Sequence, residues 1–125
     1  MADAHWLKDP EPHDFAAAAE YLSLVAGRND VRGLVDRLEK ADRTARKAKD
    51  LLRAAWLPLL PADDPSAARD LAKVKSGEKL SPVLLIRGNA RKGIPLTIAD
   101  GYHRVCASYH LDEDEPVACR IVDLP

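Results

Sequence analysis

The chain has 125 residues, of which 46% are hydrophobic and 31% charged. This length and composition are typical of one ordinary globular domain, or of a small domain with an added arm. The formal net charge of -1 excludes a general electrostatic attraction to nucleic acids or membranes, so any such binding would need a local patch.

The sequence has no feature that indicates a membrane or a secretory route. Its start lacks a basic stretch followed by an apolar core, so we expect no signal peptide, and no apolar run approaches membrane-spanning length. The two cysteines, Cys106 and Cys119, do not have the spacing of a metal-binding pair. A cytoplasmic protein with reduced thiols and no membrane partner is the simplest interpretation.

Apolar residues at helical spacing predict three helices in residues 1–56. The first is expected over residues 15–26, ending at the glycine that follows. The second begins at a cap, Asn29 or Asp30. The third is expected over residues 44–56. The beginning of the chain therefore reads as a helical segment.

Basic residues crowd the third predicted helix outside its apolar face. Arg43, Arg46, Lys47 and Arg53 are the residues of this group that we expect to contact nucleic acid, if the chain binds it. Because acidic residues lie nearby, a solvated helix face is the alternative interpretation.

The second half of the chain mixes helix and strand signals, which indicates an α/β (α+β) class. Asp63-Asp64-Pro65 predicts the start of a helix, with a capping acid and a proline at the first position. Val83–Ile86 predicts a compact strand, Ile94–Ile98 a second strand after a charged loop, and Val117–Val122 a last strand.

The most informative stretch is Asp100-Gly101-Tyr102-His103-Arg104, which follows the second predicted strand and opens a helix. A helix start has free backbone N–H groups and the positive end of the dipole, so it favours anions. The first turn of a helix normally carries acids, yet this one carries His103 and Arg104. We therefore expect a phosphate as their partner, and Gly101 lets it approach the backbone closely.

Each residue of the motif also has a structural interpretation. Asp100 is either the helix N-cap or a ligand of Mg²⁺, which would hold a carboxylate and a phosphate together. His103 is either a surface histidine or a donor to phosphate that can exchange protons. Arg104 either binds phosphate or is a structural salt-bridge partner, for example of an acid in residues 112–115. Cys106 is expected to pack in the core rather than to act as a thiolate.

From Asp64 to Asp123 the chain resembles the ParB N-terminal domain/sulfiredoxin superfamily. The resemblance rests on a Leu-Ala pair at Leu71-Ala72, a proline before a strand that ends in arginine (Pro82 to Arg87), the motif at 100–104 and the closing strand at 116–122. It covers about half of the chain, in the family's order and with similar spacing. It implies a small mixed-sheet domain over residues 57–125.

Two activities of the superfamily are not implied. Sulfiredoxins carry Gly-Cys-His-Arg with a nucleophilic cysteine, whereas Tyr102 stands at that position here, and a phenol cannot do that sulfur chemistry. Partition-type ParB proteins carry Gly-Glu-Arg-Arg, of which only Gly101 and Arg104 match. With no helix-turn-helix reader behind the domain, a full chromosome-segregation role is not expected.

The Asp-Gly-X-His-Arg form is similar to smaller members of the superfamily, some of them nucleases and some small-molecule kinases. The resemblance implies a nucleotide such as ATP or CTP at the helix start, with Mg²⁺ held by Asp100. Backbone N–H groups near Gly101 and Tyr102 would cradle the phosphate, and Arg104 would neutralise its charge. Asp100 and His103 are then the expected catalytic residues, and phosphoryl transfer or nucleotide hydrolysis is the expected reaction.

Two other functions stay open at this point. One is a DNA-binding protein or small nuclease that uses the basic residues around Arg46. The other is an interaction module without catalysis, since a fold does not fix a function. Because about 60 residues bury only a marginal core, residues 1–56 are expected to cap residues 57–125 or to form a homodimer through their helices.

Overall fold

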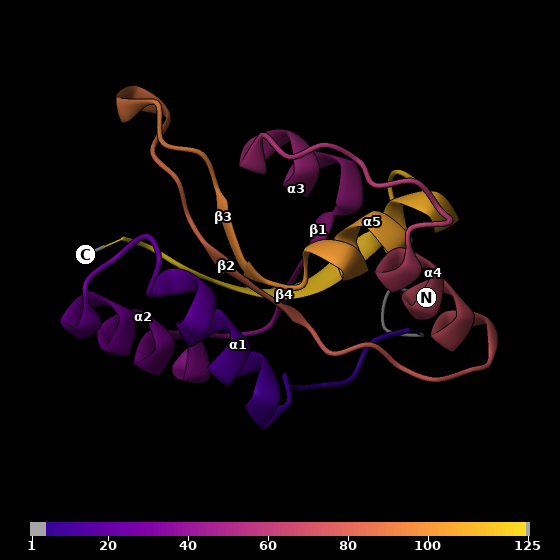
Figure 1. Cartoon of the computed structure of the whole chain (residues 1–125), viewed down its shortest axis with the longest axis horizontal. Helices are drawn as coiled ribbons and strands as arrows, with labels where there is room; N and C mark the ends of the chain where they lie inside the picture. Colours follow the sequence, from indigo (N-terminus) through magenta and orange to yellow (C-terminus); the bar gives the residue numbers. More distant parts are fainter. Residues whose placement is uncertain (1–4, 125) are drawn as a thin grey trace.

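The structure is a computed structural model that describes residues 5–124 and has a mixed α/β fold (Figure 1). In chain order its elements are α1 (Pro12–Leu22), α2 (Arg28–Lys40), β1 (Thr44–Lys47), α3 (Ala48–Ala55), α4 (Pro65–Lys75), β2 (Val83–Ile86), the short 3-10 helix η1 (Ala90–Lys92), β3 (Thr97–Asp100), α5 (Tyr102–Leu111) and β4 (Pro116–Val122). No helix within residues 5–124 combines the length and the apolar character that crossing a bilayer requires.

The four strands form one mixed sheet in the order β1-β4-β2-β3. The central pair, β4 and β2, is parallel, with Val83 opposite Cys119. Each edge strand is antiparallel to its neighbour, β1 to β4 and β3 to β2. The expected mixed sheet is therefore present, and the strands predicted over residues 83–86 and 117–122 are confirmed.

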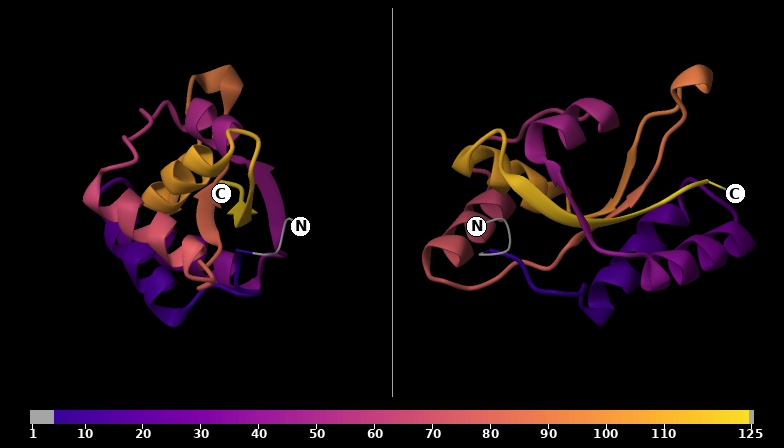
Figure 2. Two further views of the ribbon diagram at one scale, coloured as in Figure 1. Left: turned by 90° about the vertical axis from the view of Figure 1, so that its right-hand side faces the viewer. Right: turned by 180° about the vertical axis from the view of Figure 1, so that it is seen from behind.

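Helices cover both faces of the sheet (Figures 1 and 2). α1 and α2 pack on one face, while α3 and α5 pack on the other, with α4 against α5. The sequence of β2 is apolar throughout because the strand is buried on both faces. Leu84 and Ile86 belong to the core under α1 and α2, and Val83 and Leu85 belong to the core under α3 and α5. Successive side chains of a strand point to opposite faces, so a strand buried on both faces needs an unbroken apolar run.

The helix predicted over residues 44–56 is wrong for its first four residues. Thr44–Lys47 form the edge strand β1, paired with β4 from Pro116 to Cys119, and only Ala48–Ala55 are helical. Backbone N–H groups of Ala48 and Lys49 donate to the carbonyls of Glu115 and Glu113, at 3.0 Å each. This pairing with a distant segment overrides the local helix preference.

Residues 1–56 thus contribute more than helices. They include α1, α2 and α3, but also the strand β1 of the common sheet. The basic residues assigned to one helix are separated, because Arg46 and Lys47 lie on β1 and Arg53 lies on α3. A role of these helices in a homodimer stays a prediction.

Several predicted boundaries differ by a few residues. α1 ends at Leu22 instead of continuing to residue 26, and Gly27, not Asn29 or Asp30, is the N-cap of α2. Asp64 caps α4 as predicted, accepting hydrogen bonds from the N–H groups of Ser66 and Ala67. The second predicted strand lies later than expected, because β3 covers Thr97–Asp100.

Replacing Leu84 by alanine is expected to lower the free energy of unfolding by about 2–5 kcal/mol, because it leaves a cavity under α1 and α2. The matched control is Leu24→Ala, since Leu24 is 81% exposed; its cost is expected to stay within about 0.5 kcal/mol. Urea unfolding measures both variants. Equal costs would show that α1 and α2 do not bury this face of the sheet.

Candidate functional site

The turn between β3 and α5 depends on Gly101. Asp100 is the last residue of β3, and Gly101 is the N-cap of α5 with a φ of 111°. A Cβ atom on Gly101 would collide with the side chain of Val83 and would lie 2.8 Å from Nη2 of Arg104. Glycine is therefore required here both for its backbone conformation and for its lack of a side chain.

The prediction that Asp100 might serve as the N-cap of this helix is wrong. The cap residue is Gly101, and no side chain of residues 5–124 caps α5. The Asp100 carboxylate instead accepts a hydrogen bond from Arg104. The first backbone N–H groups of α5 are left for another acceptor, which is the property that lets a helix start hold an anion.

Arg104 lies between two carboxylates from different elements. Its Nη2 is 2.9 Å from Oδ2 of Asp100, and its Nη1 is 3.6 Å from Oδ1 of Asp14 on α1. The Arg104 side chain is 16% exposed, and Asp14 is 1% exposed. The interpretation of Arg104 as a salt-bridge partner is therefore confirmed, although its partners are Asp100 and Asp14 and not an acid in residues 112–115. These contacts hold the guanidinium in one position.

Asp14 is the part of this site that sequence reasoning missed. Its Oδ2 accepts a hydrogen bond of 2.8 Å from the backbone N–H of Glu11, as part of a capping box at the start of α1. An acid in the first helical turn is normally explained by such a cap alone. The sequence carries no signal that Asp14 also reaches Arg104, because the contact depends on α1 packing against β3.

The two carboxyl groups have opposite preferences for the proton. Burial alone would raise the pKa of Asp14, but hydrogen bonds from the backbone of Glu11 and from Ser81, together with Arg104, lower the pKa below its ordinary value. Burial raises the pKa of Asp100, and the opposing effect of Arg104 does not cancel it. Asp14 is thus the ionised partner of the guanidinium, and Asp100 is the member of the pair that takes up a proton more readily.

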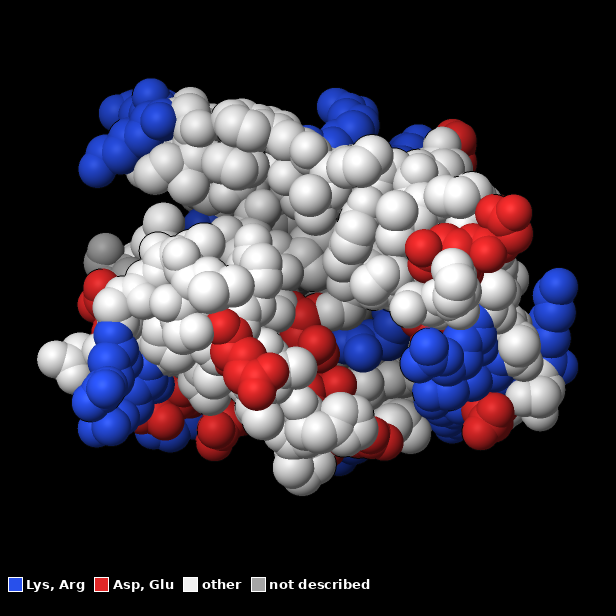
Figure 3. Space-filling model, viewed as in Figure 1, with Lys and Arg blue, Asp and Glu red and all other residues white. Residues whose placement is uncertain are grey.

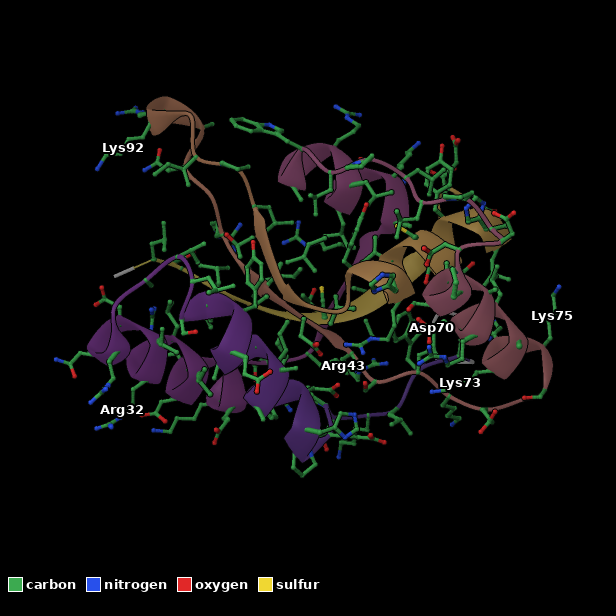
Figure 4. The ribbon with its side chains drawn as sticks, viewed as in Figure 1. Arg32, Arg43, Asp70, Lys73, Lys75 and Lys92 are labelled. Carbon is green, nitrogen blue, oxygen red and sulfur yellow. The ribbon has the colours of Figure 1, made fainter. Side chains whose placement is uncertain are left out.

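Side chains of α4 form the rim of the site, because α4 packs against α5. Burial raises the pKa of Asp70, while Arg104, Lys73 and His103 act in the opposite direction. These charges therefore act on one another in the folded chain. Figure 4 shows Asp70 and Lys73 on α4, and Figure 3 shows basic side chains gathered over this helix. His103 itself is exposed.

The side chain of Tyr102 reaches a segment outside the motif, although its ring centroid lies 5.6 Å from that of His103. Its hydroxyl donates to the backbone carbonyl of Pro58, and burial raises the pKa of the phenol. Cys106 is fully buried, and burial raises the pKa of its thiol, so its predicted place in the core is confirmed. Only the backbone N–H of Tyr102 can then serve a ligand at the start of α5.

Two carboxylates of the site are candidate ligands of a metal ion. Asp14 and Asp100 supply oxygens of the kind that Mg²⁺ uses, but Arg104 lies against both of them. Among residues 5–124 there is no group of three or more His, Cys, Asp or Glu that could hold a metal ion. While Arg104 stays in place these residues do not fit Mg²⁺, and its binding at Asp100 stays a prediction.

The basic residues proposed for nucleic acid do not form one surface. Arg46 and Lys47 are consecutive in β1, so their side chains leave opposite faces of the strand. Lys47 lies 3.7 Å from a carboxylate oxygen of Asp114. Arg43 is half-buried before β1, and Arg53 lies on α3. Binding of nucleic acid through these residues stays a prediction.

In comparisons with known proteins, no family model, curated protein or solved structure matches the chain.

Replacing Gly101 by alanine is expected to lower the free energy of unfolding by about 2–5 kcal/mol, from about 1–2 for the left-handed backbone and about 1–3 for the collision with Val83. Gly93→Ala is the control, because Gly93 has a φ of 68° but no atom within 4 Å of an added Cβ. Its cost is expected to be only the backbone contribution, about 1–2 kcal/mol. Chemical denaturation compares the two, and equal costs would contradict the tight contact at Gly101.

Replacing Asp14 by asparagine is expected to cost about 1–3 kcal/mol of unfolding free energy near pH 7, because it removes the ionised partner of Arg104. A pKa held below the ordinary 3.8 means that Asp14 stabilises the fold above that value and loses this effect as the pH falls through the lower, folded-state pKa. The cost is therefore expected to shrink as the pH falls below 3.8.

Asp100→Asn is the matched variant with the opposite trend. A raised pKa means that the folded protein favours protonated Asp100, so ionisation weakens the fold as the pH rises. The free energy of unfolding of Asp100→Asn, taken relative to that of the unchanged protein at the same pH, is therefore expected to be higher near neutral pH than in acid. A cost of Asp14→Asn that does not vary with pH would show that Asp14 is not the ionised partner.

Proposed function

We propose that the junction of β3 and α5 binds the phosphate groups of a nucleotide such as ATP or CTP, and that the chain is a small member of the ParB/sulfiredoxin type. The observation that carries this proposal is the start of α5, whose first backbone N–H groups are capped by no side chain of residues 5–124. Free N–H groups and the helix dipole at such a start favour a phosphate.

The charged groups around the start of α5 would have different roles in holding a phosphate. Asp14 neutralises much of the charge of Arg104, so Arg104 acts mainly as a fixed anchor whose position does not change when a ligand binds. His103 and Lys73 supply the cationic groups at the edge, where a phosphate would still be partly in water. Asp70 opposes them, because its carboxylate repels an anion when it is ionised.

A reaction at this position would be phosphoryl transfer or nucleotide hydrolysis, in which a protein contributes mainly position and charge. Asp100, whose burial raises its pKa, and His103 are the groups that could move a proton beside the phosphate. They are the catalytic residues of the proposal. The alternatives, a DNA-binding protein or small nuclease and a module without catalysis, stay predictions, since no contact in the described residues favours them.

Calorimetric titration with ATP, CTP, ADP and GTP, with and without Mg²⁺, tests the proposal. Lys73→Gln is expected to weaken the binding of one of these nucleotides by about threefold to tenfold, as the loss of one charge-assisted contact does. Lys75→Gln is the matched control, because Lys75 lies on the same helix and is exposed, pointing away from the site (Figure 4). Asp70→Asn is expected to strengthen binding, because it removes a repulsive charge.

Absence of heat with all four nucleotides would overturn the proposal. Equal effects of Lys73→Gln and Lys75→Gln would also contradict it, because they would place the nucleotide away from the start of α5. These variants change partly or fully exposed side chains, so a loss of binding cannot be attributed to unfolding once their urea unfolding curves match that of the unchanged protein.

A further inference from the structure

A cavity lies at the opposite end of β3 from Asp100. Its volume is about 500 Å³, and it separates α3 from the arm formed by residues 87–96, which projects beyond the sheet (Figures 1 and 2). Figure 3 shows the surface hollowed beside this arm and mainly free of acidic and basic side chains. The size lies within the range of cavities that bind small molecules.

The walls of this cavity are apolar and come from separate parts of the chain. Trp56 is 68% exposed at the end of α3, and Ile94 on the arm is 39% exposed. Leu96, at the start of β3, and Ile121 of β4 complete the apolar lining. Exposed aromatic and aliphatic side chains that converge on one hollow are typical of a binding site rather than of an ordinary surface.

Two features fix these walls before any ligand arrives. The backbone N–H of Leu96 donates to the carbonyl of Ala54 at 2.9 Å, which ties the base of the arm to α3. Trp56 is the C-cap of α3 and, among the described residues, the one non-glycine residue with a positive φ, 57°. A bulky residue rarely adopts this conformation, and here it places the indole at the cavity.

The charged groups at the cavity favour an anion. Arg46 lines it from β1, and its side chain makes no ion pair or hydrogen bond within residues 5–124, whereas the side chain of Arg87 is engaged by Asp123 at 2.7 Å. Lys92, at the tip of the arm, adds positive charge nearby (Figure 4). Asp50 is the opposing acid at the rim.

We infer that this cavity binds a small amphipathic anion, with a planar apolar body against Trp56 and Ile94 and one acidic group on Arg46. A small molecule is favoured over a peptide or a second copy of the chain because the walls enclose a hollow of limited volume with one available guanidinium. The site is separate from the phosphate site of the proposed function and does not depend on it.

The test uses two fluorescent probes with the same aromatic skeleton, 8-anilinonaphthalene-1-sulfonate, which is an anion, and N-phenyl-1-naphthylamine, which is neutral. The anionic probe is expected to bind more tightly. Arg46→Gln is expected to lower the affinity for the anionic probe by about tenfold, the effect of losing one charge-assisted contact, and to leave the affinity for the neutral probe unchanged. Trp56→Ala is expected to weaken both probes.

Arg32→Gln is the control for the loss of one positive charge, because Arg32 is exposed on α2, away from the arm (Figure 4). It is expected to leave both affinities unchanged. Near-UV circular dichroism and urea unfolding establish that each variant is folded, so probe binding does not report loosened structure.

Three results would overturn the inference. Equal affinity for the two probes would show that the negative charge does not contribute to binding. An equal effect of Arg46→Gln and Arg32→Gln would show that Arg46 does not contact the anion. If sedimentation showed that the chain self-associates and that the probes bind only to the separated chains, a second copy would be the occupant.

Discussion

The position of one guanidinium links most of the molecule. Arg104 of α5 lies between Asp100, which ends β3, and Asp14, which lies on the helix α1 beneath the sheet. An arginine that is 16% exposed needs such partners, because an unpaired buried charge is costly. The same contacts bring together α1, the end of β3 and the start of α5, so the geometry of the proposed phosphate site and the packing of the helical layers depend on each other.

A consequence of this ion pair is that the proposed phosphate site has little net positive charge at its base. Asp14 is ionised against Arg104, and Asp100 carries the proton more readily. The attraction for a phosphate then comes from the free N–H groups of α5 and from the exposed edge, where Lys73 and His103 lie close to Asp70. Such a site is selective by position more than by total charge, because backbone donors act only at hydrogen-bond distance.

The strand β3 separates two surfaces of different chemistry. At its end, polar and charged groups surround the start of α5. At its beginning, Trp56 and Ile94 expose apolar surface to a cavity that also contains Arg46. The division follows from the sheet: β2 is buried on both faces and forms the rigid centre, whereas the arm extends past the sheet and leaves a hollow against α3.

The sequence determined the features whose causes are local. The apolar run of β2, the cap of α4 at Asp64, the turn at Gly101 and the burial of Cys106 all follow from preferences that act within a few residues, and the structure has each of them. The mixed α/β class could be predicted for the same reason, because the helix and strand signals that indicate it are local.

Only the tertiary structure decided the strand β1, the partners of Arg104 and the cavity beside the arm. Thr44–Lys47 is a strand because β4 supplies the hydrogen-bond partners, although the residues themselves are compatible with a helix. Asp14 reaches Arg104 because α1 covers the sheet next to β3, and Trp56 and Ile94 line one cavity because Leu96 is tied to Ala54. These contacts join segments distant in the chain, and local preferences carry no information about which distant segments meet.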